Sequence, residues 1–411
     1  MSHATRRITY ISYADSTGYG IAAEGYVRCL VDAGHEVHWT PWPNAALWAG
    51  RISAQELSNG RALVCARGMS GPNNPGKALI ARTSAPVAAE LCILHLMPRF
   101  WPGFLPAQQP VIGMTVWETD RITPHWLPVL AQVDHLCVPS THNAEVLRAH
   151  ADTLPPVSVV AHVRPPPAAT LGAARLAGLA AWLDIRPGDS VFYSINAWDP
   201  RKRLAALIRG FIATFSAADP VVLVIKTGRF AQFDDPELGQ DGRDLVRSVP
   251  KLIARLAAEA GKAAPRIALW ADDEIAEPVI AALHDLGHCY VSFSRCEGFG
   301  LGSFEAAARG RPVLAVGYGG PVDYLGQDWP GRIAHHMVAA THIAGVNWFD
   351  ADQQWPEPED AMACALMRGF VDDPEPMQRA ARAAMPAIAL RFGAEAVTAA
   401  LEAMLDTVVP R

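Results

Sequence analysis

The stretch from Ser294 to Val316, SRCEGFGLGSFEAAARGRPVLAV, decides how this chain is interpreted. The apolar residues Cys289–Phe293 just before it predict a buried strand. Three closely spaced glycines then predict a loop: Gly298, Gly300 and Gly302. Ser303 is the expected N-cap of a helix over Phe304–Arg309, and Pro312–Val316 predicts a second strand.

A glycine loop between a strand and a helix suits a pyrophosphate. Glycines let the backbone approach the ligand closely, and the free N–H groups and positive dipole end of the helix attract its charge. Glu297 at the loop entrance and Glu305 in the first helical turn can accept hydrogen bonds from sugar hydroxyls. Taken alone, Glu305 would also serve to complement the helix dipole. The whole pattern favours a ligand that carries both phosphates and sugars.

The arrangement resembles the donor site of the retaining glycosyltransferases of family 4 (glycosyl transferases group 1), which are of the GT-B type with two facing Rossmann-like domains. The resemblance implies that Glu297 contacts the transferred sugar and that Glu305 holds the ribose diol of the nucleotide. It also implies that the backbone between them contacts sugar and phosphate at Phe299, Gly300 and Leu301. The likeness is strong from Asn196 to Leu325 and weak before Pro139.

A second segment, NAWDPRKRL at Asn196–Leu204, is basic and resembles the arginine and lysine segment of the same family. Fixed cations of this kind stabilise the charge that develops on a pyrophosphate leaving group. Lys202 matches the lysine, but the arginine expected five positions earlier is Ala197. Three other cations are candidates to replace it: Arg201, Arg203 and Lys226. A solvated basic helix start remains the alternative for Lys202 and Arg201.

Length and composition favour a globular protein of two domains. The chain has 411 residues, of which 50% are hydrophobic and 18% are charged. Its formal net charge is −6 and no basic run stands out, so no nucleic-acid partner is expected. Neither a signal peptide nor a run of about 18 apolar residues is present, so no spanning helix is predicted. We therefore expect a cytoplasmic protein, with peripheral association at the inner face of the membrane for a lipid-linked acceptor.

The residues give no sign of a metal site. The seven cysteines are scattered without a C-x-x-C pair, which favours reduced thiols and argues against zinc. The adjacent acids Asp234–Asp235 and Asp272–Asp273 suit magnesium but lie outside the glycine loop, and we interpret the second pair as helix caps. Lysine and arginine are expected to neutralise the phosphates without a metal or other cofactor.

The first half predicts one βαβ domain. Its opening predicts a strand, a glycine loop, a helix and a strand: Arg7–Ala14, Asp15–Gly20, Ile21–Ala33 and His35–Trp42. After Gly18 and Gly20 the next glycine is Gly25, too late for the G-x-G-x-x-G fingerprint, so a nicotinamide cofactor is disfavoured. The resemblance implies that Gly18 and Gly20 let donor and acceptor approach; a tight turn is the alternative. Residues 43–86 read as irregular, where acceptor-specific loops are expected.

Three polar residues follow expected strands of this half. His95 ends the strand Leu91–Leu96, and Glu118 and Asp120 follow the strand Pro110–Trp117. Ligands of parallel sheets sit at the carboxyl ends of strands, so these three are candidates for an acceptor site or cleft. Helix capping, loop hydrogen bonds and a satisfied core histidine are the alternatives.

The second half alternates strands and helices, which implies a parallel sheet with right-handed crossovers. Its expected strands before the glycine motif are Ser190–Ala197, Val221–Thr227 and Arg266–Ala271. The segment WPEPED is expected to start a helix. RPPPAA at Arg164–Ala169 marks the domain boundary. The fold class is thus α/β, with two facing Rossmann-like domains around a deep cleft: residues 1–165 for the acceptor, 166–390 for the nucleotide sugar, and a final helix, 391–411, that crosses back to the first domain.

These observations predict a retaining hexosyltransferase. It would move a sugar from a UDP- or GDP-linked donor to a saccharide or lipid-linked saccharide, in polysaccharide or surface-glycan biosynthesis. A nucleotide-sugar epimerase of the same fold is one alternative. A non-catalytic nucleotide-sugar-binding subunit is another, which Ala197 in place of the arginine keeps open. The base, the sugar, the acceptor and the oligomeric state stay open.

Overall fold

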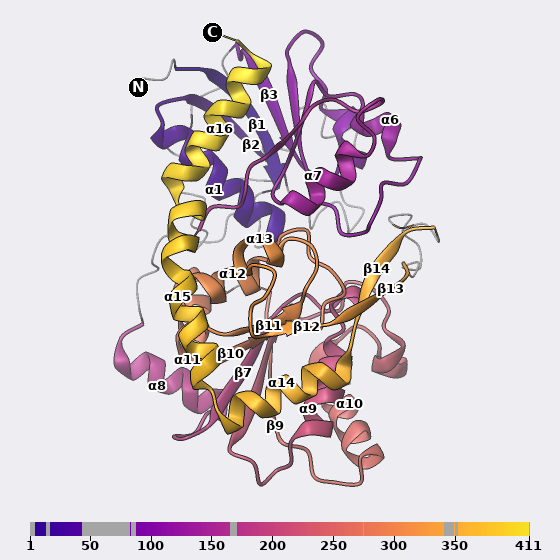
Figure 1. Ribbon diagram of the computed structural model, residues 1–411, viewed down its shortest axis with the longest axis vertical. Coiled ribbons are helices and arrows are strands. Elements are labelled where there is room, and N and C mark those ends of the chain that lie inside the picture. Colours follow the sequence, from indigo (N-terminus) through magenta and orange to yellow (C-terminus); the bar gives the residue numbers. More distant parts are fainter. Residues whose placement is uncertain are drawn as a thin grey trace. The chain divides into compact units, whose positions relative to one another are not determined.

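The computed structural model describes residues 5–13, 17–42, 83, 88–164, 171–273, 275–340, 349 and 352–410 (Figure 1). The chain divides into two compact units. The first comprises Met1–Trp117, Arg121–Pro165 and Leu390–Arg411, and the second comprises Glu118–Asp120 and Pro166–Ala389. The loops expected within residues 43–86 lie outside the described residues, apart from Thr83, and so does most of the RPPPAA linker.

The first unit is built on a six-stranded parallel sheet in the order β2-β1-β3-β4-β5-β6. Its strands are β1 Arg7–Tyr13, β2 Glu36–Trp42, β3 Leu91–His95, β4 Val111–Met114, β5 His135–Val138 and β6 Val157–Val159. Every residue of β3, β4 and β5 is buried, as expected for central strands of a parallel sheet that is covered on both faces. Ile8 of β1 lies opposite Leu91 of β3, which fixes the register of the two strands.

Helix α1 (Gly18–Asp32) begins three residues earlier than the sequence predicts. Thr17 is its N-cap, and the Thr17 hydroxyl accepts a hydrogen bond from the backbone N–H of Gly20 at 3.4 Å. Gly18 and Gly20 therefore belong to the first turn of a helix, and the expectation that both lie in a loop is wrong.

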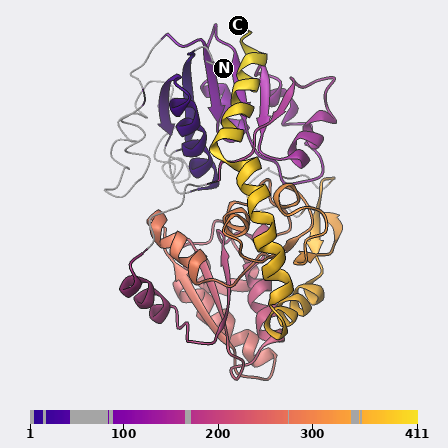
Figure 2. The ribbon, with the colours of Figure 1, turned by 60° about the vertical axis from the view of Figure 1, so that its left-hand side comes forward.

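The last helix, α16 (Ala394–Val408), packs beside α1 within the first unit, as the yellow and indigo helices of Figures 1 and 2 show. Val397, Leu401, Met404 and Leu405 of α16 join the same apolar core as β1 and α1. Two polar contacts accompany this packing. The Glu402 carboxylate lies 2.7 Å from Nε2 of the buried His35, and Arg6 donates to Asp406 at 2.6 Å.

The remaining helices of the first unit are short. They are η1 Pro98–Gly103, α6 Leu127–Leu130 and α7 Thr141–Arg148. Ser140 caps α7 by accepting a hydrogen bond from the N–H of Asn143 at 3.3 Å.

The second unit has a six-stranded parallel sheet in the order β12-β11-β10-β7-β8-β9. Its strands are β7 Ser190–Ile195, β8 Val221–Thr227, β9 Arg266–Ala271, β10 Cys289–Val291, β11 Val313–Val316 and β12 Arg332–Ile333. Counted from β7, this is the doubly wound order 3-2-1-4-5-6 read from the other edge. The predicted α/β class with two Rossmann-like parallel sheets is confirmed.

The helices of this unit follow the strands, as the alternation in the sequence predicts. They are α8 Ala173–Trp182, η2 Pro200–Lys202, α9 Leu204–Thr214, η3 Pro236–Asp241, α10 Leu245–Glu259, α11 Glu277–Leu286, α12 Leu301–Ala308, α13 Pro321–Leu325 and α14 Asp360–Asp372. Helices α9, α10 and α14 share one apolar core with β7, β8 and β10. A further helix, α15 Glu375–Phe392, precedes α16. No helix in these described parts of the chain is both long and apolar enough to cross a membrane.

An antiparallel hairpin follows β12 in the second unit. Its strands are β13 His335–Ala339 and β14 Gln354–Pro358, with Met337 opposite Pro356. The expectation that WPEPED starts a helix is therefore wrong, because its first four residues belong to β14 and α14 begins only at Asp360. Trp355 of the hairpin packs in a small apolar cluster with Cys296. The hairpin thus lies against the residue that precedes Glu297.

Candidate functional site

The glycine motif and the basic segment meet where the strand order of the second sheet reverses. Strands β7 and β10 are neighbours in that sheet, yet one leads to β8 and the other to β11 on opposite sides. Ligands of open α/β sheets bind at the carboxyl ends of the two strands that flank such a reversal. Asn196–Arg203 follows the end of β7, and Ser292–Gly300 follows the end of β10. Topology alone therefore places both motifs at the expected ligand site of this unit.

Lys202 and Glu297 form a close ion pair at this site. The Lys202 Nζ lies 2.6 Å and 2.5 Å from the two carboxylate oxygens of Glu297. Both side chains are largely buried, at 13% and 14% exposure. Burial opposes the ionisation of Glu297, but the charges of Lys202 and Arg201 outweigh it and hold the pKa of Glu297 below its usual range. The carboxylate is consequently a fixed negative charge over the physiological pH range.

Arg201 completes a four-residue charged cluster with Glu118, Lys202 and Glu297. Its guanidinium donates to the carbonyl of Cys296 at 2.5 Å and lies 3.5 Å from Glu118 and 3.8 Å from Glu297. Burial opposes its charge, but Glu118 and the other nearby acids outweigh that effect and raise the pKa of Arg201. Two cations and two carboxylates thus balance each other in a largely dry place.

The other two candidate cations lie elsewhere in the unit. Arg203 makes a bidentate pair with Asp360 at 2.7 Å and 3.0 Å. Burial lowers the pKa of Lys226, and the nearby Asp273 and Asp272 oppose that shift. Of the three residues that the sequence offers to replace the missing arginine, Arg201 is therefore the one that approaches Glu297.

The glycine loop holds the start of α12 in a conformation that few residues other than glycine adopt. Gly300 precedes the helix with φ at 85°, in the left-handed region. No side chain caps α12, so its first N–H groups have no side-chain acceptor among the described residues. Gly320 packs so closely that a Cβ atom there would lie 2.3 Å from Cα of Phe299. These features fix the backbone of the loop, and its role as a phosphate cradle stays a prediction.

The expected cap of this helix is wrong. Ser303 lies inside α12, where its hydroxyl donates to the carbonyl of Gly300 at 2.9 Å and lies 2.6 Å from the Tyr324 hydroxyl. The left-handed Gly300 allows the helix to begin at Leu301, two residues before Ser303. Phe299 is buried, and its ring packs against Phe304 and Tyr324.

Glu305 stands on α12 and contacts a histidine that the sequence analysis did not single out. Its Oε2 lies 3.1 Å from Nε2 of His284, on α11. The ring of His284 is fully buried, and the Glu305 side chain is 12% exposed. A lone histidine in a predicted helix was the only signal for this contact in the sequence.

Glu118 and Asp120 belong to the second unit, although the sequence places them in the first half. The Asp120 carboxylate accepts a hydrogen bond from the N–H of Gln354 at 2.7 Å, and the Asp120 N–H donates to the Gln354 carbonyl at 3.0 Å. Gln353 donates to the Thr119 hydroxyl at 2.7 Å. These contacts fasten the segment to the hairpin and bring Glu118 to Arg201.

Glu357 on β14 is a second residue that sequence reasoning missed. It accepts from Arg295 at 2.5 Å and lies 3.0 Å from Arg203. These two arginines flank the charged cluster in sequence, one after Lys202 and the other two residues before Glu297. Glu357 therefore ties the segment after β7 to the segment after β10.

His95 lies in the first unit and is a core histidine in this structure. It is 2% exposed, and its Nδ1 lies 2.9 Å from the hydroxyl of Tyr10. Burial, with a smaller effect from His162, lowers the pKa of His95 to about 3. The imidazole is therefore neutral at physiological pH. Gly18 and Gly20 lie in α1 of the same unit.

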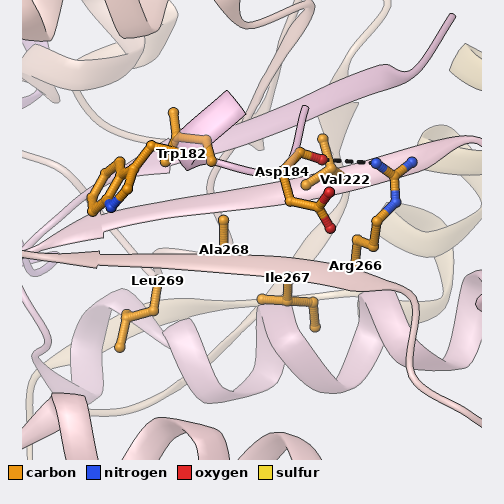
Figure 3. Close-up of a pocket in the computed structure, with 8 residues that line it drawn as sticks. Trp182, Asp184, Val222, Arg266, Ile267, Ala268 and Leu269 are labelled. Carbon is orange, nitrogen blue, oxygen red and sulfur yellow. Dashed lines mark hydrogen bonds between the residues drawn. The ribbon is translucent and has the colours of Figure 1, made fainter. Parts of the chain in front are cut away.

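Two cavities of the second unit differ in size and chemistry. A cavity of about 450 Å³ opens beside the edge strand β9, between Trp182 and Arg266 (Figure 3). Arg266 is already occupied there, since it donates to the carbonyl of Asp184 at 2.8 Å and pairs with Asp189. A cavity of about 10 Å³ next to Glu297 is lined by Ser292, Ser294 and Ser303 and has room for one water molecule. The large cavity lies beside a charged pair that is already satisfied, whereas the small one adjoins Glu297 and the glycine loop, so chemistry favours the surroundings of the small one as the site.

The acids outside the loop show no metal arrangement in the described parts of the chain, where no group of three possible ligands gathers. Asp273 instead accepts a hydrogen bond from the N–H of Arg229 at 3.0 Å. The interpretation of Asp272 and Asp273 as helix caps is wrong, because α11 begins after Ala276 without a side-chain cap.

The comparisons with known proteins rest on structure. No family model and no curated protein matches the sequence. The fold is similar to sucrose-phosphate synthase from Thermosynechococcus elongatus, with a TM-score of 0.64, 15% identity and 98% of each chain covered. It is also similar to a glycosyltransferase from Rickettsia africae, with a TM-score of 0.62, 13% identity and both chains fully covered. A third similar structure is HepE from Anabaena in complex with UDP-glucose. The TM-score is 0.61 and the sequence identity is 15%, with 98% of this chain and 100% of HepE covered. At these identities the likeness establishes a shared fold.

Proposed function

We propose that this protein is a glycosyltransferase that moves a sugar from a nucleotide diphosphate sugar to a saccharide or lipid-linked saccharide, with retention of the anomeric configuration. One observation carries the proposal: Lys202, Arg201 and Glu297 converge beside the uncapped start of α12, at the carboxyl ends of β7 and β10. Cations and free N–H groups suit a pyrophosphate, and the carboxylate suits sugar hydroxyls.

In the proposed reaction the two cations stabilise the charge that develops on the leaving diphosphate. Lys202 and Arg201 are each within 4 Å of Glu297, so they are already concentrated where that charge would form. A diphosphate would compete with Glu118 for Arg201, because the four charges balance without a ligand. These cations take the place of a metal, and Glu297 contacts the transferred sugar. The departing phosphate assists attack by the acceptor from the same face, which accounts for retention.

The similar folds support a UDP-linked donor as the first to test. HepE is described in complex with UDP-glucose and also with UDP and glucose. A GDP-linked donor is the other choice for this chain. We propose that the reaction belongs to polysaccharide or surface-glycan assembly in the cytoplasm, at the inner membrane face where a lipid-linked acceptor would present its sugar.

Product detection with Glu297→Gln tests the proposal. Wild-type protein is incubated with UDP-glucose or GDP-mannose and oligosaccharide acceptors, and the elongated product is measured by mass spectrometry. Loss of a fixed charge that acts in the transition state should lower turnover by about 100-fold or more. Glu375→Gln, an identical change at a side chain that is 54% exposed, is the matched control and should retain full turnover.

Three results would separate the alternatives. An epimerase would convert the donor sugar without extending any acceptor. A binding subunit would bind the nucleotide sugar and show no turnover for the mutation to reduce. Equal turnover in wild type and Glu297→Gln would remove the charged cluster from the mechanism.

A further inference from the structure

A buried chain of three polar side chains ends at Glu305. The hydroxyl of Tyr193 lies 3.0 Å from Nδ1 of His284, and Nε2 of His284 lies 3.1 Å from Oε2 of Glu305. The three residues come from β7, α11 and α12 of the second unit, which their side chains link. Tyr193 and His284 are fully buried. A polar chain through an apolar interior is costly to maintain unless each member is satisfied.

The chemistry of the three groups fixes the direction of the hydrogen bonds. An ionised carboxylate only accepts, so Nε2 of His284 must carry the hydrogen that is donated to Glu305. In the neutral imidazole Nδ1 is then an acceptor, and the Tyr193 hydroxyl donates to it. Glu305 therefore selects the tautomer of His284, and the Tyr193 hydroxyl supports it by donating to Nδ1. With a neutral imidazole, each of these two hydrogen bonds therefore has one direction.

One oxygen of Glu305 is thereby held, and the other has no protein partner among the described residues. The carboxylate stands on the helix that begins at the glycine loop, one turn from Leu301. Without His284, binding a ligand would have to order this side chain, at a cost in side-chain entropy. The histidine removes much of that cost before a ligand arrives.

We propose that His284 and Tyr193 are positioning residues that orient the Glu305 carboxylate toward the vicinal diol of a ribose. This inference rests on the proposed function, since it requires a nucleotide at the glycine loop. A diol presents two hydroxyl donors, and the oriented carboxylate supplies the acceptors for them. The two residues help the site to distinguish nucleotides with ribose hydroxyls from those without them, and they do not contact the sugar–phosphate bond that breaks.

The test compares nucleotides with and without the diol. Isothermal titration measures the Kd of UDP and of 2′,3′-dideoxy-UDP, and of GDP and its dideoxy analogue, for wild type and variants. His284→Leu removes the donor to Glu305 at a similar volume and should weaken binding of the ribonucleotide about 10-fold, or about 1.4 kcal/mol. Binding of the dideoxy analogue should change less than about 2-fold, because it lacks the hydroxyls that Glu305 binds.

Two further variants keep the test decisive. The side-chain amide of His284→Gln can still donate to Glu305 and should recover most of the ribonucleotide affinity. Tyr193→Phe keeps the ring but removes the hydroxyl that donates to Nδ1 of His284, and should weaken only the ribonucleotide, by about 3-fold on the scale of one hydrogen bond. It also provides the measurement if His284→Leu fails to fold.

The outcomes distinguish this inference from the proposed function. Equal weakening of both nucleotides in His284→Leu would show a merely structural role and overturn the inference, as would unchanged ribonucleotide binding. A wild-type protein that binds UDP and its dideoxy analogue equally would also overturn it, while sugar transfer could still be observed. Selective binding of the ribonucleotide without any transfer would leave the inference standing and remove the proposed function. Failure to bind either nucleotide would remove both.

Discussion

The two sheets differ in what stands at the carboxyl ends of the strands where their order reverses. In the first unit these strands are β1 and β3, and the described residues there include the neutral, buried His95 beside Tyr10. In the second unit they are β7 and β10, where Lys202, Arg201 and Glu297 gather. The topology is comparable and the chemistry is opposite. A parallel sheet therefore supplies a place for a ligand, and the residues after the strands decide what that ligand is.

The same contrast extends to how the charged side chains of each unit are paired. In the first unit Glu402 and Asp406 pair with His35 and Arg6 to hold α16 on the sheet. In the second unit the buried charges converge on one another next to an uncapped helix start. We infer that the polar groups of the first unit serve stability and those of the second serve binding. The substitutions below test whether a residue of one unit affects binding or stability.

The largest effect is expected from Lys202→Met. Removing the cation that contacts both oxygens of Glu297 should lower sugar transfer by about 100- to 1,000-fold, the range for a lost electrostatic contact to a transition state. Lys262→Met is the matched control, because Lys262 only donates to the Ala213 carbonyl at an exposed site. Initial rates at saturating donor measure the difference. Comparable losses in both variants would show that the cluster has no special role.

The next effect concerns stability of the first unit. Glu402→Ala leaves Nε2 of the buried His35 without its acceptor and should lower the free energy of unfolding by about 2–3 kcal/mol. Glu402→Gln keeps an acceptor for Nε2 and should cost less than about 1 kcal/mol. Denaturant titration measures both values, and nucleotide binding should remain unchanged in both variants. Loss of binding would contradict the division between a structural and a binding unit.

The third effect is a pH dependence that also belongs to the first unit. Burial lowers the pKa of both His95 and His162 to about 3, so the folded protein leaves them neutral where the unfolded chain protonates them. Stability should therefore fall as pH drops from about 6.5 toward 3, by up to about 1.4 kcal/mol per pH unit for each histidine. His95→Asn keeps an acceptor for Tyr10 and should remove one histidine's share of this slope. An unchanged slope in unfolding midpoints at pH 5 to 7 would show that His95 titrates normally.

The sequence predicts most of the second unit because its signals are local. The apolar runs of β8 and β9 predict the observed bounds of both strands, Val221–Thr227 and Arg266–Ala271. The start of α12 is misplaced because Ser303 is a better cap by residue type than Gly300, whose left-handed conformation is visible only in the structure. Prolines within WPEP argue against a strand, yet an antiparallel hairpin with one partner tolerates them.

The contacts that the sequence could not supply are long-range. Thr119 and Gln353 are 234 positions apart, and no local pattern links them. The same holds for Tyr193 and His284, which meet through packing of β7 against α11. The ion pair of Arg201 with Glu118 is a further example, because the two residues are far apart in the sequence. The resemblance to a known family makes Glu297, Glu305 and Lys202 candidates, but their contacts with other side chains are visible only in the structure.

The most direct test of the central claim is a thermal-shift panel of UDP, GDP, ADP and their common sugars. A nucleotide at about 100 times its Kd stabilises the folded state by about 2.7 kcal/mol, enough to raise the midpoint by several degrees. We predict that one base gives such a shift and that Glu305→Ala, which removes the proposed ribose contact, abolishes most of it. The absence of a shift with every nucleotide at millimolar concentration would contradict the claim that the charged cluster and glycine loop form a nucleotide-sugar site.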